Sequence, residues 1–211
     1  PSGYRSINTP ALDELAADSM TFRRAYCQYP VCGPSRASFL SGLYPETTGV
    51  LNNTSDIRQS RPDSVSIPEH FKANGYWTAS VGKIFHSTRH QHGEVAWHEQ
   101  IMFQNDELPS VTKARKIYEA ENGSVDLRAN RKNWKEHLQK LSTQTRGQTP
   151  PGYGPTGLND EQHKDGKNVR QIINWLEQKK HGEKPFFIAC GIQKPHVPFL
   201  APQKYFDLYP Q

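Results

Sequence analysis

The sequence has no run of about 18 apolar residues, so nothing in it predicts a segment that spans a bilayer. It has no signal peptide and opens at Pro1 without a methionine, which we interpret as the mark of a processed or truncated chain. Only 34% of the 211 residues are apolar, so the predicted core is lean. The 16 prolines without a period, the 22 aromatic residues and the lack of sustained heptads exclude collagen, a coiled coil and a wholly disordered chain.

The chain also has few cysteines and a small net charge. Cys27, Cys32 and Cys190 allow at most one disulfide, which excludes a disulfide scaffold and leaves at least one thiol that needs another explanation. The 26 basic and 21 acidic residues give a net charge of only +5. The basic residues are scattered, without a basic stripe that carries interleaved aromatics, so we expect no nucleic acid partner. A small or polymeric anion fits this charge better.

Helix signals and apolar runs alternate along the chain. Ser66-Ile67-Pro68-Glu69 is a capping box that opens a helix, and the run Phe186–Cys190 is typical of a buried parallel strand. The same rules predict helices that open near Pro10 and Ser35, a strand over 76–81 and a helix over 169–176. This order of helices and strands predicts α/β layers.

The signals fade between residues 87 and 158. Polar residues dominate this stretch, Gln148–Pro155 has the composition of a loop, and one helix is expected over 129–141. We therefore expect one domain over 1–211 with an irregular insertion at about 87–158. Long irregular loops around α/β sites often carry substrate selectivity, so we expect it to reside here.

Cys32 is the first candidate functional residue. It lies just before a predicted helix and Arg36 follows four residues later, so its side chain faces the positive end of the helix and a guanidinium. Positive charge from both would lower the pKa of a thiol or hold an anion beside it. A small buried cysteine with a surface arginine is the alternative, because free cysteine is among the most buried residue types.

The whole string favours the functional interpretation. Cys32-Gly33-Pro34-Ser35-Arg36, followed by Leu40-Ser41-Gly42, resembles the signature of the type I sulfatase family. In that family a formylglycine-generating maturation enzyme oxidises the cysteine. The resemblance implies that Cys32 is the catalytic residue, as a formylglycine hydrate, and that in this form it is a metal ligand. It also implies the alkaline-phosphatase/sulfatase-like α/β fold, a mixed, mostly parallel sheet flanked by helices, incomplete in this chain.

A second string points to the same family. Gly75-Tyr76-Trp77-Thr78 followed by Gly82-Lys83-Ile84-Phe85-His86 resembles the second sulfatase signature. Lys83 and His86 come just after a predicted strand, at the edge where open α/β sheets bind ligands. Lysine offers a compact cation for an anionic oxygen, and histidine moves protons near neutral pH. Without the motif, a solvated lysine and a loop histidine would be the better interpretation.

A third string follows the last predicted strand. Lys194-Pro195-His196-Val197-Pro198-Phe199 places polar side chains at a strand end, and its prolines stiffen the loop around His196. A capping histidine in a rigid turn is the alternative. Together with Tyr205–Pro210 and Gly82–His86, the string resembles the iduronate-2-sulfatase branch of the family. The resemblance runs from about Thr9 to Pro210, with a divergent middle.

The resemblance implies an enzyme that hydrolyses sulfate esters of sulfated carbohydrates, such as glycosaminoglycans or another sulfated polysaccharide. It implies Ca²⁺ as the cofactor, and export to a periplasmic, extracellular or lysosomal location. Lys83, Lys194 and His196 are expected to bind the substrate. The catalytic residues that it implies are Cys32, Arg36, Lys83, His86 and His196.

The family's other metal ligands have no counterpart in this sequence. We find neither the Asp pair that precedes the cysteine signature nor the distal Asp with His or Asn. We therefore expect part of one sulfatase catalytic domain, which needs the remainder of the polypeptide or a second chain. Two other functions stay open. One is a phosphate ester hydrolase of the same superfamily, against which Cys32 argues because those enzymes usually use Thr or Ser. The other is a non-catalytic binder of sulfated glycans.

Overall fold

The computed structural model describes residues 7–86 and 93–209. Its central sheet has three parallel strands in the order β2-β1-β4. These strands are β1 (Trp77–Gly82), β2 (Glu99–Ile101) and β4 (Phe186–Gly191). A second parallel sheet joins two short strands, β3 (Tyr153–Pro155) and β5 (Phe199–Ala201). The parallel sheet confirms the predicted fold class.

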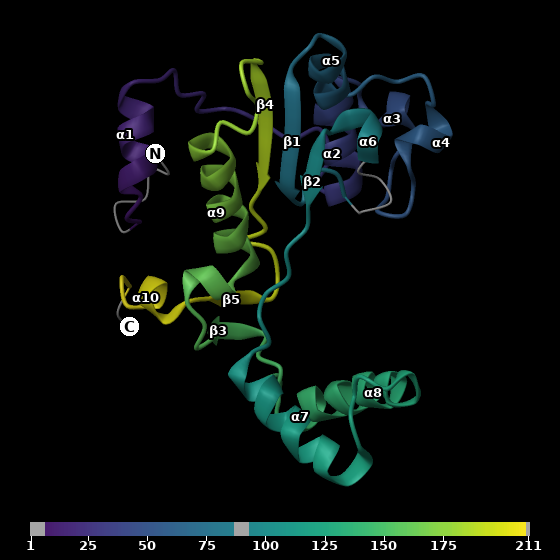
Figure 1. Cartoon of the computed structure of the whole chain (residues 1–211), viewed down its shortest axis with the longest axis vertical. Coiled ribbons are helices and arrows are strands. Elements are labelled where there is room, and N and C mark those ends of the chain that lie inside the picture. The colour runs from purple at the N-terminus through teal and green to yellow at the C-terminus, as the bar shows by residue number, and fades with distance from the viewer. Residues whose placement is uncertain (1–6, 87–92, 210–211) are drawn as a thin grey trace.

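Helices cover both faces of the central sheet (Figure 1). The longer helices are α1 (Pro10–Ala17), α2 (Cys32–Ser41), α5 (Ile67–Ala73), α7 (Pro109–Asn122), α8 (Arg128–Gln144) and α9 (Lys164–Glu177). The short ones are α3 (Pro45–Thr48), α4 (Ile57–Ser60), α6 (Gly93–Ala96), α10 (Gln203–Phe206) and the 3-10 helix η2 (Asp160–Gln162). In the described part of the chain, no helix is both long enough and apolar enough to cross a membrane.

The core is divided by the sheet. On one face, Trp77, Ala79 and Val81 of β1 pack against Trp175 of α9. On the other face, Leu40 of α2 packs with buried residues that follow β1 and with α6. Alternate residues of a strand point to opposite faces, so the two helical layers bury both sides of β1. All six residues of β1 are buried, as expected for the middle strand of a parallel sheet.

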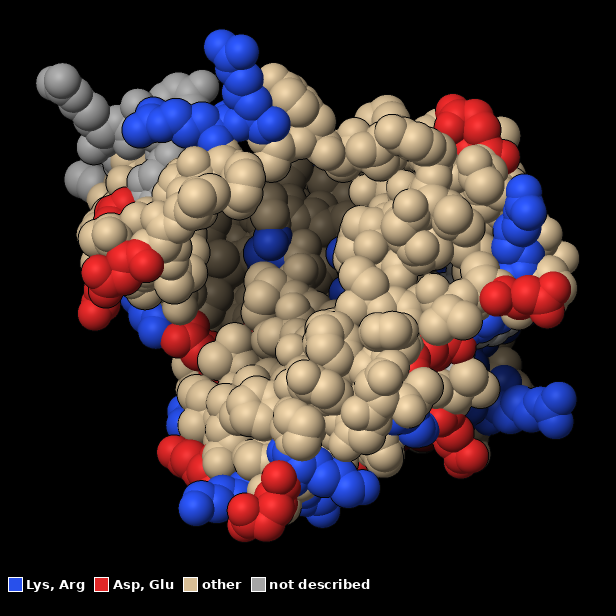
Figure 2. Space-filling view, turned by 90° about the horizontal axis from the view of Figure 1, so that it is seen from above, with Lys and Arg blue, Asp and Glu red and all other residues tan. Residues whose placement is uncertain are grey.

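β4 is less covered than β1, although its sequence is more apolar. Among the strands that the structure describes, it lies at the edge of the sheet. Phe186 is 46% exposed, Cys190 is exposed, and only Gly191 of this strand is buried. Figure 2 shows the molecule from above, where its surface is hollowed and Lys and Arg side chains lie among Asp and Glu side chains.

The structure confirms several local predictions and corrects others. The capping box forms, because the backbone N–H and the hydroxyl of Ser66 both donate to Glu69 Oε2. α2 begins at Cys32 and not near Ser35, so Cys32 is the first residue of its helix. Within the segment expected to be an irregular insertion at 87–158, the helix expected over 129–141 forms as α8, which is 17 residues long. α7, which is 14 residues long, was not expected, because its charged surface weakens the apolar periodicity that predicts helices.

Candidate active site

The candidate site starts at the N-terminus of α2. Cys32 is half-buried there, and the next residue, Gly33, donates its N–H to Asn53 Oδ1 at 2.8 Å. A Cβ atom on Gly33 would lie 2.8 Å from the carbonyl oxygen of Asn52 and 3.0 Å from Asn53 Oδ1. Glycine therefore lets the loop around Asn53 approach the backbone beside Cys32. Val31 at the N-cap position provides no side-chain cap, and Asn53 Oδ1 accepts the Gly33 N–H of the first turn of α2 in its place.

Arg36 links α2 to the end of β1. Its Nη1 donates to the carbonyl oxygens of Lys83 at 2.7 Å and Ile84 at 2.6 Å. Burial lowers the pKa of the Arg36 guanidinium, and the electrostatic interaction with Cys32 opposes this shift. The structure therefore brings Cys32, Arg36 and the backbone of Lys83 together, as the first two sequence motifs predict.

Lys83 and His86 follow β1 directly. Gly82 has a φ of 76°, which turns the chain out of the strand. The Lys83 side chain is half-buried, and His86 shares a small cavity with Gly33 and Ala37 of α2. The β1 end and the start of α2 therefore meet on one side of the sheet, with both motif segments in contact.

Lys194 and His196 follow β4, whose end lies beside that of β1. The pair Gly82 and Gly191 closes the parallel ladder, and a Cβ atom on Gly191 would collide with the backbone of Lys83. His196 is exposed, and its Nδ1 lies 2.7 Å from the carbonyl oxygen of Val197. In the described part of the chain, no hydrogen bond joins the His196 side chain to Cys32, Arg36, Lys83 or His86.

The Lys194 side chain points back to its own loop. Its Nζ donates to the carbonyl oxygens of His196 at 3.1 Å and Pro198 at 2.5 Å. Burial lowers the pKa of the Lys194 ammonium, an effect that Asp165 opposes and Lys164 increases. Lys194 therefore braces the loop that carries His196.

Two residues of α9 bind the end of β4 and the loop that follows it. Neither belongs to the three sequence motifs. Asp165 accepts hydrogen bonds from the backbone N–H groups of Gln193 and Lys194, each at 2.9 Å. Asn168 is 2% exposed and donates from Nδ2 to the carbonyl oxygen of Gly191 at 3.0 Å. A Cβ atom on Gly82 would meet the Asn168 amide. The one sequence signal for this arrangement was a pair of polar residues in the first two turns of an amphipathic helix.

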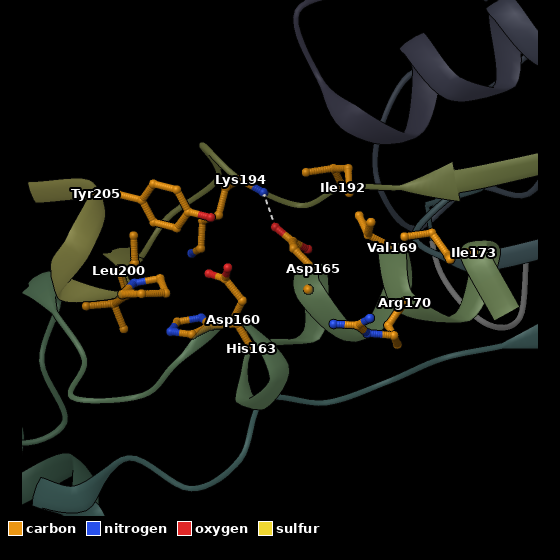
Figure 3. A pocket seen from close by; sticks show the side chains of 13 residues that line it. Asp160, His163, Asp165, Val169, Arg170, Ile173, Ile192, Lys194, Leu200 and Tyr205 are labelled. Atoms are coloured by element: carbon orange, nitrogen blue, oxygen red, sulfur yellow. Dashed lines mark hydrogen bonds between the residues drawn. The ribbon is translucent and has the colours of Figure 1, made fainter. Parts of the chain in front are cut away.

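A cavity of about 540 Å³ opens beside the Asp165 contact (Figure 3). Val169 and Ile173 of α9, with Leu200 of β5, form much of its apolar wall. Its polar lining comes from Asp160, His163, Asp165, Arg170 and Lys194. His163 is 7% exposed, and its Nε2 lies 2.8 Å from Thr156 Oγ1. Burial is the main reason why the pKa of His163 is lowered, so the neutral ring is favoured in this pocket.

The described residues do not form a calcium site by themselves. No group of three or more His, Cys, Asp or Glu side chains in this part of the chain is arranged to hold a metal ion. The charged neighbour that we find for Cys32 is the cation Arg36. A hard cation with six to eight oxygen ligands needs carboxylates that this arrangement lacks.

Comparisons with known proteins agree with the motifs. The sulfatase family model matches residues 2–211. A sulfatase of Formosa agariphila is 34% identical over 99% of this chain and 38% of its own length. The iduronate 2-sulfatases of Mus musculus and Homo sapiens are 33% and 32% identical over 99% of this chain and 34% of theirs. The chain thus spans little more than a third of the length of these curated relatives.

Two solved structures share the fold. The phosphonate monoester hydrolase of Agrobacterium radiobacter superposes with a TM-score of 0.65 at 19% identity, covering 99% of this chain and 40% of that one. Ps i-CgsB in complex with k-i-k-neocarrahexaose superposes with a TM-score of 0.62 at 17% identity, over 99% and 44% of the two chains. At these identities the likeness concerns the fold alone.

Proposed function

The chain belongs to the sulfatase family, and we propose that the protein to which it belongs hydrolyses sulfate esters of sulfated carbohydrates. One observation carries the proposal. Arg36, one helical turn from Cys32, donates two hydrogen bonds to the backbone at Lys83 and Ile84, which supports one site built from both sulfatase motifs. An anionic group beside Cys32 would lie among cations and the positive end of α2.

In the first proposed step, Cys32 acts after its oxidation to formylglycine by the maturation enzyme. The aldehyde is hydrated, and one of its hydroxyl oxygens forms a bond to the sulfur of the substrate as its proton passes to water. The bond between sulfur and the sugar oxygen breaks, and His196 supplies the proton that the sugar oxygen takes up. Arg36 and Lys83 stabilise the negative charge on the attacking and sulfuryl oxygens.

The second proposed step releases sulfate. His86 takes the proton of the remaining hydroxyl of the hydrate, and the carbonyl bond of the aldehyde forms again as the bond between carbon and the sulfated oxygen breaks. Sulfate leaves, and water hydrates the aldehyde for the next turnover. The position of His86 beside the start of α2 supports this role.

Substrate contact is assigned to the ends of β1 and β4. Lys83 and His196 are proposed to bind the sulfate group, since they follow neighbouring parallel strands. Lys194 is proposed to serve this site by holding the His196 loop, because its ammonium already donates to two carbonyl groups there.

The proposal extends to the longer protein. Ca²⁺ and formylglycine are general features of sulfatases, and we propose both for this one, with Cys32 as formylglycine among the calcium ligands and the other ligands supplied outside this chain. The uncovered edge of β4 supports a further strand from the remainder of the polypeptide. We also propose export, on the family resemblance.

The substrate class is proposed from relatives. Because two of them are iduronate 2-sulfatases, 2-O-sulfated uronates of glycosaminoglycans or of a similar polysaccharide are the first substrates to test. The test is a desulfation screen of the full-length protein, produced with the maturation enzyme, on defined sulfated uronates and hexosamines. Peptide mass spectrometry across Val31–Arg36 measures conversion of Cys32 in the same sample.

We expect formylglycine at position 32, release of sulfate from at least one sugar, and loss of both in Cys32→Ala. A matched Cys27→Ala variant keeps both, since Cys27 lies outside the motif. Unmodified thiol with binding but no release would overturn the proposal in favour of a glycan-binding protein. Faster hydrolysis of the corresponding phosphate esters would favour a phosphate ester hydrolase.

A further inference from the structure

The helices α7 and α8 form a separate helical hairpin, residues 109–146, which we call the basic hairpin. It extends away from the central sheet (Figure 1). It has its own small core, in which Tyr118, Val125 and Trp134 are buried. The rings of Tyr118 and Trp134 lie 5.2 Å apart. Substitutions on the outer surface of this hairpin therefore leave the sheet and its strand ends intact.

The net charge of the chain is concentrated in this hairpin. Residues 109–146 contain nine Lys and Arg and four Asp and Glu, a formal charge of +5 that equals the charge of the whole chain. The remaining residues are neutral overall, and Lys, Arg, Asp and Glu side chains intermingle on the face seen in Figure 2. The sequence prediction of scattered basic residues misses this concentration.

Four of the cations lie on one face of α8. Arg128, Arg131, Lys132 and Lys135 are spaced i, i+3, i+4 and i+7, which places them on one side of a helix, and all four are exposed. We call them the α8 stripe. Trp134 is buried on a different side of the helix. At about 1.5 Å of rise per residue the stripe extends over about 10 Å.

The first cation of the stripe, Arg128, lies at the positive end of the α8 dipole, where a cation is unfavourable. Arg128 is the first residue of α8, the first turn contains no acidic residue, and the N-cap residue Leu127 provides no side-chain cap. Cations at the positive end of a helix are unfavourable, because their charge and the dipole repel each other. Folding alone does not favour arginine at this position, but an anionic ligand at this end of the helix would.

Few acidic side chains compensate the stripe. Among the described residues, one ion pair involves it, between Lys132 and Glu136 at 3.9 Å, with side chains 86% and 55% exposed. Such an exposed pair contributes little. Arg131 donates from Nε to the backbone carbonyl of Asp126 at 3.2 Å, so its substitution would also remove a contact within the hairpin.

The kind of anion follows from what the hairpin displays. Both large aromatic residues, Tyr118 and Trp134, are buried in its core, so they are not available for stacking on nucleic acid bases. A row of exposed cations without aromatics fits a polymer whose anionic groups, rather than its rings or bases, are recognised.

We propose that the α8 stripe is a binding surface for the sulfated polysaccharide itself, outside the site that contains Cys32. This inference rests on the proposed function for the identity of the polyanion. The hairpin holds an anionic chain while the sheet edge acts on one sulfate ester, which raises the local concentration of substrate. A short monosulfated substrate does not reach the stripe and gains nothing from it.

The test compares two triple variants of the full-length protein with equal charge loss. One changes the stripe, Arg128→Gln with Lys132→Gln and Lys135→Gln. The matched control changes exposed lysines elsewhere on the hairpin, Lys113→Gln with Lys116→Gln and Lys140→Gln. Binding to heparin, to its desulfated form and to duplex DNA is measured by calorimetry at low and high salt, and thermal unfolding checks the fold.

We expect the stripe variant to bind heparin roughly tenfold or more weakly and the control within about threefold of the unchanged protein, with a shallower salt dependence in the stripe variant. Equal weakening in both variants, equal binding of desulfated heparin, or tighter binding of DNA than of heparin would overturn the inference.

The proposed function fails by a different measurement. Both triple variants are expected to hydrolyse the monosulfated uronates and hexosamines of the desulfation screen at the unchanged rate. Absence of turnover in all proteins, with stripe-dependent heparin binding retained, would contradict the sulfatase proposal and leave the binding surface. Turnover without stripe-dependent binding would contradict this inference alone.

Discussion

Asp165 accepts hydrogen bonds from two consecutive backbone N–H groups, with Oδ1 bound to Gln193 and Oδ2 to Lys194 at 2.9 Å each. The carboxylate belongs to the first turn of α9, and the N–H groups belong to the loop that leads to His196. Hydrogen bonds to a charged acceptor are roughly twice as strong as neutral ones, so this contact positions the loop.

We predict that Asp165→Asn lowers kcat of the full-length enzyme roughly tenfold, because the amide keeps only one of the two acceptor oxygens. KM should change little, because a displaced His196 impairs proton donation in the transition state more than it weakens binding of the substrate. Glu161→Gln is the matched control, because within the described ranges the Glu161 side chain makes only an exposed 3.4 Å ion pair with Arg170. An unchanged kcat with a lower melting temperature would leave Asp165 a purely structural role.

Gly33 offers a test of the approach between α2 and the Asn53 loop. Gly33→Ala places a Cβ atom 2.8 Å from the Asn52 carbonyl oxygen, so we expect a loss of about 1–3 kcal/mol in the free energy of unfolding. Gly152→Ala is the control, since the Cβ atom that it adds would meet no described neighbour within 4 Å. Chemical unfolding of both variants measures the difference, and equal stability would show that the loop adjusts freely.

His163 predicts a pH dependence of stability. Burial lowers its pKa below the ordinary value of 6.5, so the unfolded chain binds a proton more readily than the folded one. The free energy of unfolding should therefore decrease as the pH falls below about 6.5. Urea unfolding at pH 7.5 and 5.5 measures the decrease. His163→Gln should reduce it, whereas the exposed control His70→Gln should not; the reverse order would contradict the assignment.

The edge of β4 predicts a difference between the isolated chain and the longer protein. The Cys190 thiol is exposed here, and we expect it to react with a thiol reagent in residues 1–211 alone. In the full-length protein we expect at least about tenfold slower labelling, because a neighbouring strand would cover this edge. Cys27, also exposed, serves as the internal reference. Equal labelling of Cys190 in both proteins, or robust sulfatase turnover by residues 1–211 alone, would contradict the proposed completion of the site.

Secondary structure and helix caps were predictable from the sequence where the interacting residues are close together in the chain. The Ser66 capping box forms as its spacing predicts, and the apolar run after Pro185 becomes β4. α8 forms where a helix was expected over 129–141, whereas α7 was missed, because its exposed polar and charged residues outnumber the few apolar ones that it contributes to the hairpin core. The residues of the predicted site come from three strings, and spacing within each string says nothing about how the strings meet.

The amino-acid sequence alone determined the family, the parallel α/β class and the proximity of Arg36 to Cys32, since one helical turn separates these two residues. Tertiary structure decided that Arg36 binds the backbone 47 residues away at Lys83, and that Asp165 holds the Lys194 loop across 29 residues. Such contacts depend on how the strands pair and the helices pack, and no local periodicity encodes them. The same holds for β4, whose apolar sequence predicts burial that the described chain alone does not provide.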